Sequence, residues 1–473
     1  MSSSVCTHSE VGSAPRLPRL DHLPPPGPRW VLWLLWGFVL AWPAVSTVIM
    51  IFLLDVETDF QELYENGRRV IQTWRIDSVY QQAPASTFYP PGTIPEFLKI
   101  KPDRDWPPQD LPSGFYPPSG MPIYMLWSAM PPVLACFASC AVYGLLFFLA
   151  VRLLPWEAMR IHPRQAWHAW LFLALVVGGY ITYDITTGQV SGIPIFALVV
   201  GYVCWRRGWI WRGAAALAVG IVFKLLPGAA VVFFLVKRQW KMVLATGLLT
   251  LAFGVLPGLV MFGPAKLVDG WKAYYANVAW PKSHPVEYQG RIRWTKPASF
   301  LNPSLSVTLL RWLSEYPRDY HTPFLPVAHF PQRAVYRGYQ LLVLVMGVVS
   351  FWMCRRRVDA EPPEALATQY GLVLVWMVLT SPHLAVYYMA WALWPVAVLM
   401  GYVARRDLLE ARPDRLNAWP IWAFAVSFPL SSVSVLRAIG MHPAMLLVLW
   451  AVLLANLLRG RFFERPAIEP AMS

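Results

Sequence analysis

The stretch "RGAAALAVGIVFKLLPGAAVVFFLVKRQWK", residues 212–241, is apolar except at its two ends and at Lys224 in its middle. Each half is too short to cross a membrane as a helix, which takes about 20 apolar residues. We therefore expect a re-entrant hairpin of two short helices that turns at residues 224–227 and leaves on the side where it entered. Irregular backbone at that depth is tolerated only against protein or a wet cavity, which places the hairpin inside a helical bundle. The alternative is a single kinked span, which would put the basic residues at 237–241 on the opposite side.

The whole chain has the composition of a polytopic membrane protein. Of its 473 residues, 56% are hydrophobic, only 14% are charged and 25 are tryptophan, whereas soluble domains contain about 25% charged residues. Apolar runs of spanning length lie at 30–54, 130–153, 167–187, 190–206, 240–262, 334–354, 365–381, 385–404, 419–437 and 442–459. The sequence predicts an all-α fold of about 10 transmembrane helices plus the hairpin.

Three regions follow from this pattern. Residues 1–29 contain three consecutive prolines and no cleavable signal pattern, so we expect a disordered cytoplasmic tail followed by a retained first span. Residues 30–459 form the predicted transmembrane domain. Residues 460–473 are a second cytoplasmic tail.

The distribution of Lys and Arg predicts the orientation. Arginine clusters precede the first run and follow alternate runs, whereas the short turns at 188–189 and 382–384 contain no Lys or Arg. Because short cytoplasmic loops are rich in basic residues, both termini are expected in the cytoplasm. Two long segments, 55–129 and 263–333, then lie outside. The only Asn-x-Ser/Thr site is blocked by Pro303, which fits a bacterial inner membrane with the active face in the periplasm.

The two outer segments differ in charge. Residues 55–129 contain six basic and ten acidic residues, whereas residues 263–333 contain nine basic and four acidic residues. An acidic segment beside a basic one suits an anionic lipid substrate, because cations can hold a phosphate while a carboxylate accepts a proton. The simpler alternative is that the basic segment rests on anionic headgroups.

Several kinds of chemistry have no motif in this sequence. It contains no GxxxxGK[ST] phosphate loop, no GxGxxG after a strand, no HExxH and no paired CxxC. We expect no cofactor, no bound metal and no nucleic-acid partner, although Asp55, Glu57 and Asp59 together could attract a divalent ion. For Asp55 and Glu57 the simpler interpretation is the polar edge of the first span.

Polar groups within the apolar runs are costly and usually face a cavity. Candidates are Asp184, Gln189, Lys224, Ser381 and His383. Each also has a purely structural interpretation: Gln189 can cap a turn, Lys224 can extend to the headgroups, and His383 can be exposed in a loop.

Six short motifs in order resemble those of glycosyltransferase family 87, a polyprenyl-phosphate-mannose-dependent group in the GT-C superfamily. They are Asp59-Phe60 with Tyr64 and Gly67, Tyr116-Pro117-Pro118, Gly188-Gln189, Lys224 with Pro227, Asn302 with Ser304, Leu305 and Arg311, and Ser381-Pro382. Ser191 replaces the family's Asn after Gly-Gln. In "SPHLAVYYMAW", Ala385 stands at a Trp position, and Tyr387 and Tyr388 stand where a His pair is common. These departures leave the sugar and the acceptor open.

The resemblance implies a membrane glycosyltransferase. The enzyme would move a hexose or pentose, with mannose favoured, from a polyprenyl-phosphate sugar to a lipid or glycan acceptor. The transfer would take place on the outer face of the membrane, where the protein contacts membrane lipids. The leaving group of this reaction is a phosphate, which departs without strong acid help when cations neutralise it. One carboxylate is therefore enough for the remaining task, the activation of the acceptor hydroxyl. The implied general base is Asp59, and the implied substrate-binding residues are Tyr64, Tyr116, Gln189, Lys224, Asn302, Arg311 and Ser381.

Two other functions remain open from the sequence. An O-antigen polymerase or ligase would use arginines in outer loops, which residues 263–333 contain, and would not need an acid directly after the first span. A lipid-linked sugar flippase or transporter would show duplicated halves with interrupted spans in corresponding positions. The chain has one Lys-Pro interruption, at 224–227.

Overall fold

A computed structural model describes residues 37, 41–49, 59–79, 117–158, 166–276, 286–288, 291–293, 304–314, 327–381, 386–410 and 414–460. The helices of its first half are α2 (Asp59–Thr73), η3 (Asp77–Val79), η4 (Pro118–Gly120), α3 (Met121–Ser128), α4 (Pro132–Glu157), α5 (Ala166–Thr186), α6 (Gly192–Arg206), α7 (Ile210–Phe223), α8 (Gly228–Val236) and α9 (Trp240–Tyr274). Strands β1 (Val286–Tyr288) and β2 (Arg291–Arg293) follow, then α11 (Leu305–Leu313), α12 (Gln332–Met353), η6 (Val358–Ala360), α13 (Pro363–Leu379), η7 (Val386–Ala392), α14 (Leu393–Glu410), α15 (Arg415–Leu430), α16 (Ser434–Ala438) and α17 (Met441–Leu458).

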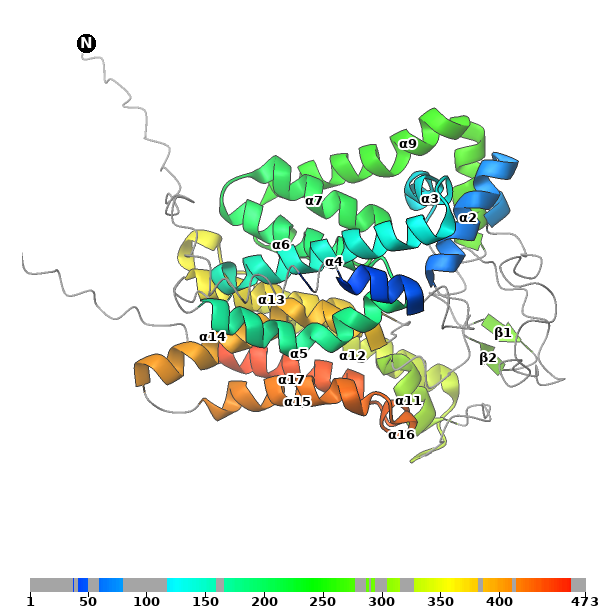
Figure 1. Ribbon diagram of the computed structural model, residues 1–473. Helices are drawn as coiled ribbons and strands as arrows, with labels where there is room; N and C mark the ends of the chain where they lie inside the picture. The colour runs from blue at the N-terminus through cyan, green and yellow to red at the C-terminus, as the bar shows by residue number, and fades with distance from the viewer. Residues whose placement is uncertain are drawn as a thin grey trace, which may run out of the picture.

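The long helices lie side by side along one direction, and α2, α3, α11 and the two strands gather at one end of the bundle (Figure 1). We call this the α2 end. The strands pair antiparallel, with Glu287 opposite Ile292, and are a small exception to the predicted all-α fold.

The apolar runs predicted the helices well. Five described helices are long and apolar enough to cross a membrane: Pro132–Leu154, Trp240–Tyr274, Gln332–Met353, Val386–Val403 and Met441–Leu458. Four shorter apolar helices are Leu171–Thr186, Gly192–Arg206, Ile210–Phe223 and Pro363–Leu379. Of the first predicted run, 30–54, only residues 37 and 41–49 are described. The prediction of a polytopic helical membrane protein is confirmed, and the extent of its three sequence regions stays a prediction.

Helix α13 forms the centre of the bundle. Its residues from Ala365 to Val375 are all buried, and most of the adjoining segment Val386–Val403 is buried as well. A helix that is apolar on every face belongs inside a protein or a membrane. By contrast, α9 and α12 expose large apolar side chains, including Leu244 and Leu344, so they lie at the periphery.

Helices α7 and α8 form the predicted hairpin, with its turn at residues 224–227. Its far end returns to the side where it began. The Lys237 ammonium there contacts the Glu361 carboxylate and donates to the carbonyl of Arg356 at 3.0 Å. The indole of Trp205, at the end of α6, donates to the Gln239 side chain at 3.1 Å. These contacts favour a hairpin over a single kinked span, and its re-entrant placement in a bilayer stays a prediction.

Helix α9 contains the predicted boundary between span and outer segment. Its backbone is helical except at Gly263, whose φ of 79° lies in the region that favours glycine. Pro264 follows, and the helix changes direction there at the α2 end of the bundle (Figure 1). The predicted span 240–262 therefore ends at the break.

The two predicted outer segments touch each other. The Lys266 ammonium donates to the carbonyl of Trp74 at 3.1 Å, and the Trp74 ring lies 5.4 Å from that of Phe262. Just beyond α2, the Arg75 guanidinium binds the Asp77 carboxylate at 2.5 Å and lowers the pKa of that carboxyl. The acidic and basic segments thus meet at the α2 end.

Candidate functional site

Lys224 lies at the centre of the candidate site. Its backbone is extended, with φ −141° and ψ 126°, directly after α7. Its ammonium donates to the Gln189 side-chain oxygen at 3.1 Å and to the Ser191 hydroxyl at 3.0 Å. The side chain is only 8% exposed. The structure thus brings two of the predicted residues, Gln189 and Lys224, into direct contact.

Three aromatic rings lie on the ammonium as well. The Lys224 nitrogen is 4.9 Å from the ring centre of Tyr388, 5.4 Å from that of Tyr387 and 6.0 Å from that of Trp391. The rings form a stack, with interplanar angles of 28° between the tyrosines and 22° between Tyr388 and Trp391. Cation–π attraction is worth about 2 kcal/mol or more when the cation is desolvated. We call Gln189, Ser191, Lys224 and these three aromatic residues the Lys224 cluster.

The start of α2 packs against Gly188, the residue before Gln189. Gly188 has a φ of +71°, and a Cβ atom placed on it would meet the Phe60 Cβ at 2.3 Å and the Phe60 nitrogen at 2.7 Å. Only a glycine allows so close an approach. The side chain of Asp59 is outside the described residues, but its neighbour Phe60 packs one residue from Gln189.

The Tyr-Pro-Pro segment also reaches this place. The hydroxyl of Ser119, in η4, donates to the carbonyl of Val222 at 2.8 Å, two residues before Lys224. Tyr116 itself lies outside the described residues. Its predicted role stays a prediction, although the chain immediately after it packs beside the Lys224 turn.

Tyr64 has a structural contact. Its hydroxyl donates to the carbonyl of Met130 at 2.8 Å, and the Ser128 hydroxyl donates to the Tyr64 carbonyl at 2.6 Å. Helix α2 is therefore tied to the turn between α3 and α4. The predicted role of Tyr64 in substrate binding stays a prediction.

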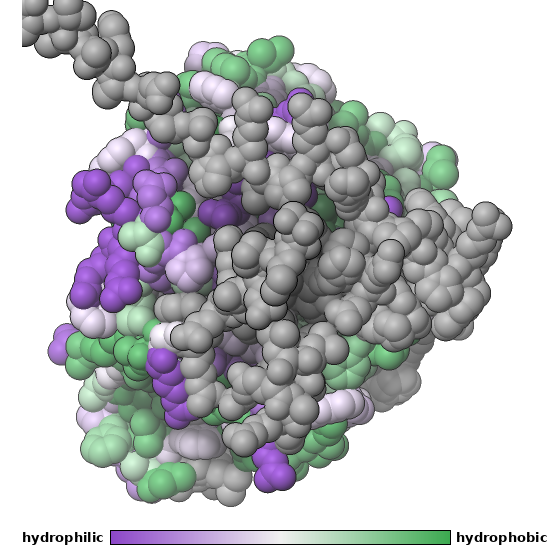
Figure 2. Space-filling model, turned by 90° about the vertical axis from the view of Figure 1, so that its left-hand side faces the viewer, coloured by the Kyte–Doolittle hydropathy of each residue, from purple (hydrophilic) through white to green (hydrophobic). Residues whose placement is uncertain are grey.

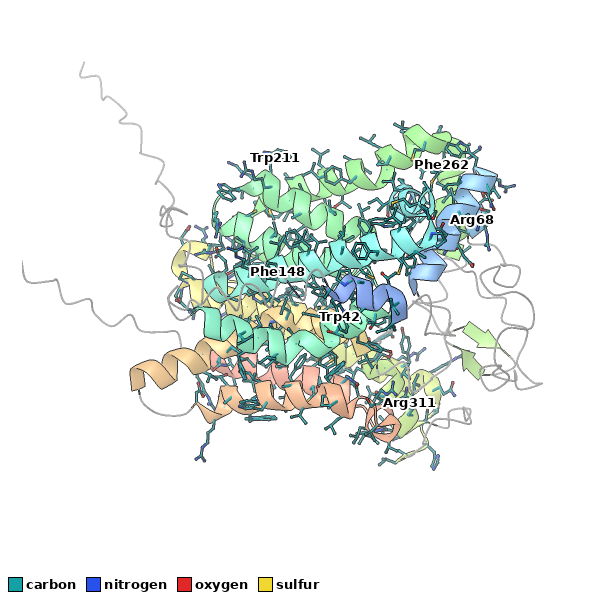
Figure 3. The ribbon with its side chains drawn as sticks, in the orientation of Figure 1. Trp42, Arg68, Phe148, Trp211, Phe262 and Arg311 are labelled. Atoms are coloured by element: carbon teal, nitrogen blue, oxygen red, sulfur yellow. The ribbon has the colours of Figure 1, made fainter. Side chains whose placement is uncertain are left out.

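Two more of the predicted residues, Arg311 and Ser381, are buried. Arg311 is 2% exposed on α11, at the same end of the bundle as Arg68 of α2 (Figure 3). Ser381 follows the end of α13, and the predicted roles of both residues stay predictions. Asn302 lies outside the described residues, but Ser304 of the same motif caps α11 by accepting from the Val307 amide at 3.3 Å.

The sequence motifs predict two of the six cluster residues, Gln189 and Lys224. Ser191, Tyr387 and Tyr388 depart from the family pattern and are absent from the predicted site, as is Trp391. These three departures were a signal, because their side chains contact Lys224. The buried Asp184, one turn before Gly188, agrees with the expectation of polar groups at depth.

An apolar groove of about 450 Å³ begins beside the Lys224 turn. Its walls come from α7, α8 and α9 and include Val222, Leu225, Val231 and Gly254, with Ser119 beside them. Leu225, the residue after Lys224, is half exposed and lines it. The groove is therefore lined by the sequence neighbours of Lys224, and Lys224 itself is not among its lining residues.

Among the described residues, no group of three or more His, Cys, Asp or Glu side chains is placed to hold a metal ion. Asp55, Glu57 and the side chain of Asp59 are outside that set. The expectation of no metal and no cofactor therefore stays a prediction.

Comparison with known proteins gives a family match. The model of glycosyltransferase family 87 matches residues 115–382, a range that includes Gln189 and Lys224 and begins after Asp59. Among solved structures, ArnT from Cupriavidus metallidurans bound to undecaprenyl phosphate is 16% identical, with a TM-score of 0.39, over 92% of this chain and 79% of that chain. Its apo state gives the same identity and TM-score over 78% of that chain. No curated protein matches the chain.

Gly188→Ala is expected to destabilise the protein more than Gly208→Ala. Both glycines have positive φ, so both substitutions carry the same backbone strain, but only the Cβ at 188 would meet Phe60, while nothing lies within 4 Å of the Cβ at 208. We expect an extra cost of roughly 1–3 kcal/mol, measured as a lower thermal midpoint in detergent. Equal midpoints for the two variants would contradict the close packing of α2 on Gly188.

Proposed function

The chain belongs to glycosyltransferase family 87, and from this premise we propose that it transfers a sugar from a polyprenyl-phosphate donor to a lipid or glycan acceptor. The sugar is a hexose, with mannose favoured. The proposed site is the Lys224 cluster together with the first residues of α2. It faces the periplasm of a bacterial inner membrane.

The observation that carries this proposal is the packing of Phe60 on Gly188. It brings the backbone beside Asp59 to within one residue of Gln189, whose side chain binds the Lys224 ammonium. The closeness of these two backbone segments supports a shared site for a carboxylate and a cation from distant parts of the sequence. Glycosyl transfer from a phosphate donor needs both, a base for the acceptor and a cation for the leaving group.

The proposed reaction assigns one task to each group. The acceptor oxygen forms a bond to the anomeric carbon, and the bond from that carbon to the phosphate oxygen breaks with its electron pair on the phosphate. The acceptor proton passes to the Asp59 carboxylate. The Lys224 ammonium stabilises the charge that develops on the phosphate, because a fixed cation in a water-poor site interacts strongly with it.

The neighbours of Lys224 support this assignment. An amide oxygen, a hydroxyl and three ring faces hold the ammonium in position. The apolar groove beside Leu225 supplies a path for the hydrocarbon chain of the donor. A lipid-linked sugar combines the two features that these surfaces recognise, a phosphate and a long apolar chain.

Asp59→Asn is expected to lower the rate of sugar transfer about 100-fold to 10,000-fold, the range that a positioned general base contributes. The assay uses membranes supplied with a polyprenyl-phosphate sugar and follows the transfer of labelled sugar. Glu57→Gln is the matched control, because it removes a neighbouring carboxylate from the same stretch, and we expect it to keep normal activity. Unchanged transfer by a normally folded Asp59→Asn protein would exclude this carboxylate as the base.

Lys224→Met is expected to weaken donor binding and to slow transfer, because it removes the cation while keeping the length of the side chain. Its readout is the protection of the purified protein against heat by the donor, since a ligand that binds the native state raises stability. Lys272→Met removes an exposed cation on α9 at the same end and should keep full protection. If the Lys224→Met protein were protected as well as the wild type while its transfer stopped, Lys224 would have no role in holding the phosphate.

Tyr388→Leu is expected to reduce transfer about 10-fold, and Tyr388→Phe to leave it nearly unchanged. Phenylalanine keeps the ring face at 4.9 Å from the ammonium, whereas leucine removes it, and about 1.4 kcal/mol of cation–π attraction corresponds to a factor of ten. Initial rates at saturating and limiting donor compare the two variants. Equal loss in both would assign the effect to the tyrosine hydroxyl instead of the ring.

A further inference from the structure

A second pocket lies at the end of the bundle opposite the candidate site. It has a volume of about 420 Å³ and is lined by Gly208, Ile210, Trp211, Lys241, Leu244, Ala245 and Leu248. Figure 3 labels Trp211 at this end, away from Arg68 and Phe262 at the α2 end. The residues of α9 that line this pocket differ from those that line the groove beside Lys224.

The pocket is lined mainly by apolar side chains and by one lysine. Leu244 and Leu248 are 70% and 58% exposed on α9, and Trp211 is 63% exposed on α7. Lys241 lies one turn before Leu244 and is also exposed. Leucine side chains in this position face the acyl chains of a bilayer, while a lysine at the helix end reaches the headgroups. Tryptophan is enriched at that same depth.

The surroundings of the pocket are positively charged. Arg212 follows Trp211 in the sequence, with its guanidinium 5.1 Å from the ring centre of Trp209. Two carboxylates at this end are paired elsewhere, Glu157 with Arg207 at 2.9 Å and Glu361 with Lys237. Figure 2 looks onto this end and shows hydrophilic residues gathered beside hydrophobic ones.

Two helices also begin at the rim of the pocket. Helices α7 and α9 start at Ile210 and Trp240, and neither has a side-chain hydrogen bond at its N-cap. The N-terminus of a helix carries partial positive charge. This charge adds to that of Lys241 on the side of the pocket where a headgroup would lie.

We propose that this pocket binds an anionic phospholipid of the leaflet opposite the candidate site. The Lys241 ammonium binds the headgroup phosphate, Trp211 packs at the level of the glycerol, and one acyl chain lies along Leu244 and Leu248. Basic pockets between membrane helices recognise anionic lipids in this way. The site is separate from the sugar-transfer site and does not depend on the proposed reaction.

The test measures lipid binding to the purified full-length protein by native mass spectrometry, with phosphatidylglycerol and phosphatidylcholine of identical acyl chains as probes. We expect the wild type to bind phosphatidylglycerol more tightly. Lys241→Gln should weaken that binding about 5-fold, the effect of one basic residue at an anionic membrane surface, and should leave phosphatidylcholine binding unchanged. Trp211→Ala should weaken the binding of both lipids.

Arg355→Gln is the matched control. Arg355 is an exposed cation whose guanidinium lies 3.9 Å from the ring centre of Trp352, and it does not line the pocket. The Arg355→Gln protein should bind phosphatidylglycerol as tightly as the wild type does. Equal affinity of the wild type for the two lipids, or an unchanged preference in Lys241→Gln, would overturn the proposal. A change of oligomeric state in Trp211→Ala without a change in lipid binding would assign the pocket to a second copy of the chain.

Discussion

The buried ammonium of Lys224 is the group on which the α2 end of this bundle depends. A charge removed from water is costly unless other groups replace its solvation. Gln189 and Ser191 supply two oxygen atoms, and Tyr387, Tyr388 and Trp391 supply ring faces. These partners come from the turn between α5 and α6 and from η7. The solvation of one cation therefore requires three separate parts of the chain to meet at one point.

Irregular backbone surrounds the Lys224 ammonium. Lys224 is extended, Gly188 has positive φ, and Val386–Ala392 is a 3₁₀ helix. In a 3₁₀ helix the side chains at i and i+3 eclipse each other, which is why Tyr388 and Trp391 stack at 22°. Irregular backbone at membrane depth is tolerated where it is buried or lines a cavity, and here it builds the surface around the ammonium.

The sequence predicted the helices more completely than the site. Apolar length is a local property, so the runs 130–153 and 442–459 fall within a few residues of Pro132–Glu157 and Met441–Leu458. The motifs also identified Gln189 and Lys224 as site residues. Their contact across 35 positions, and the position of Tyr388 over the ammonium, depend on how α6, α7 and η7 pack. No periodicity in a single sequence carries that information.

The two helices that lead to and from the Lys224 cluster are short. Helix α6 has 15 residues and α7 has 14, which gives lengths of about 22 and 21 Å, against about 30 Å for the hydrocarbon of a bilayer. Helix α6 ends and α7 begins beside Arg206, Arg207 and Trp209, residue types that are common at the ends of membrane-spanning segments. Lys224 directly follows the shorter of the two helices. In the proposed function, the hydrocarbon chain of the donor would lie in the groove beside Leu225, and the low dielectric around a buried ammonium would strengthen its attraction for the donor phosphate.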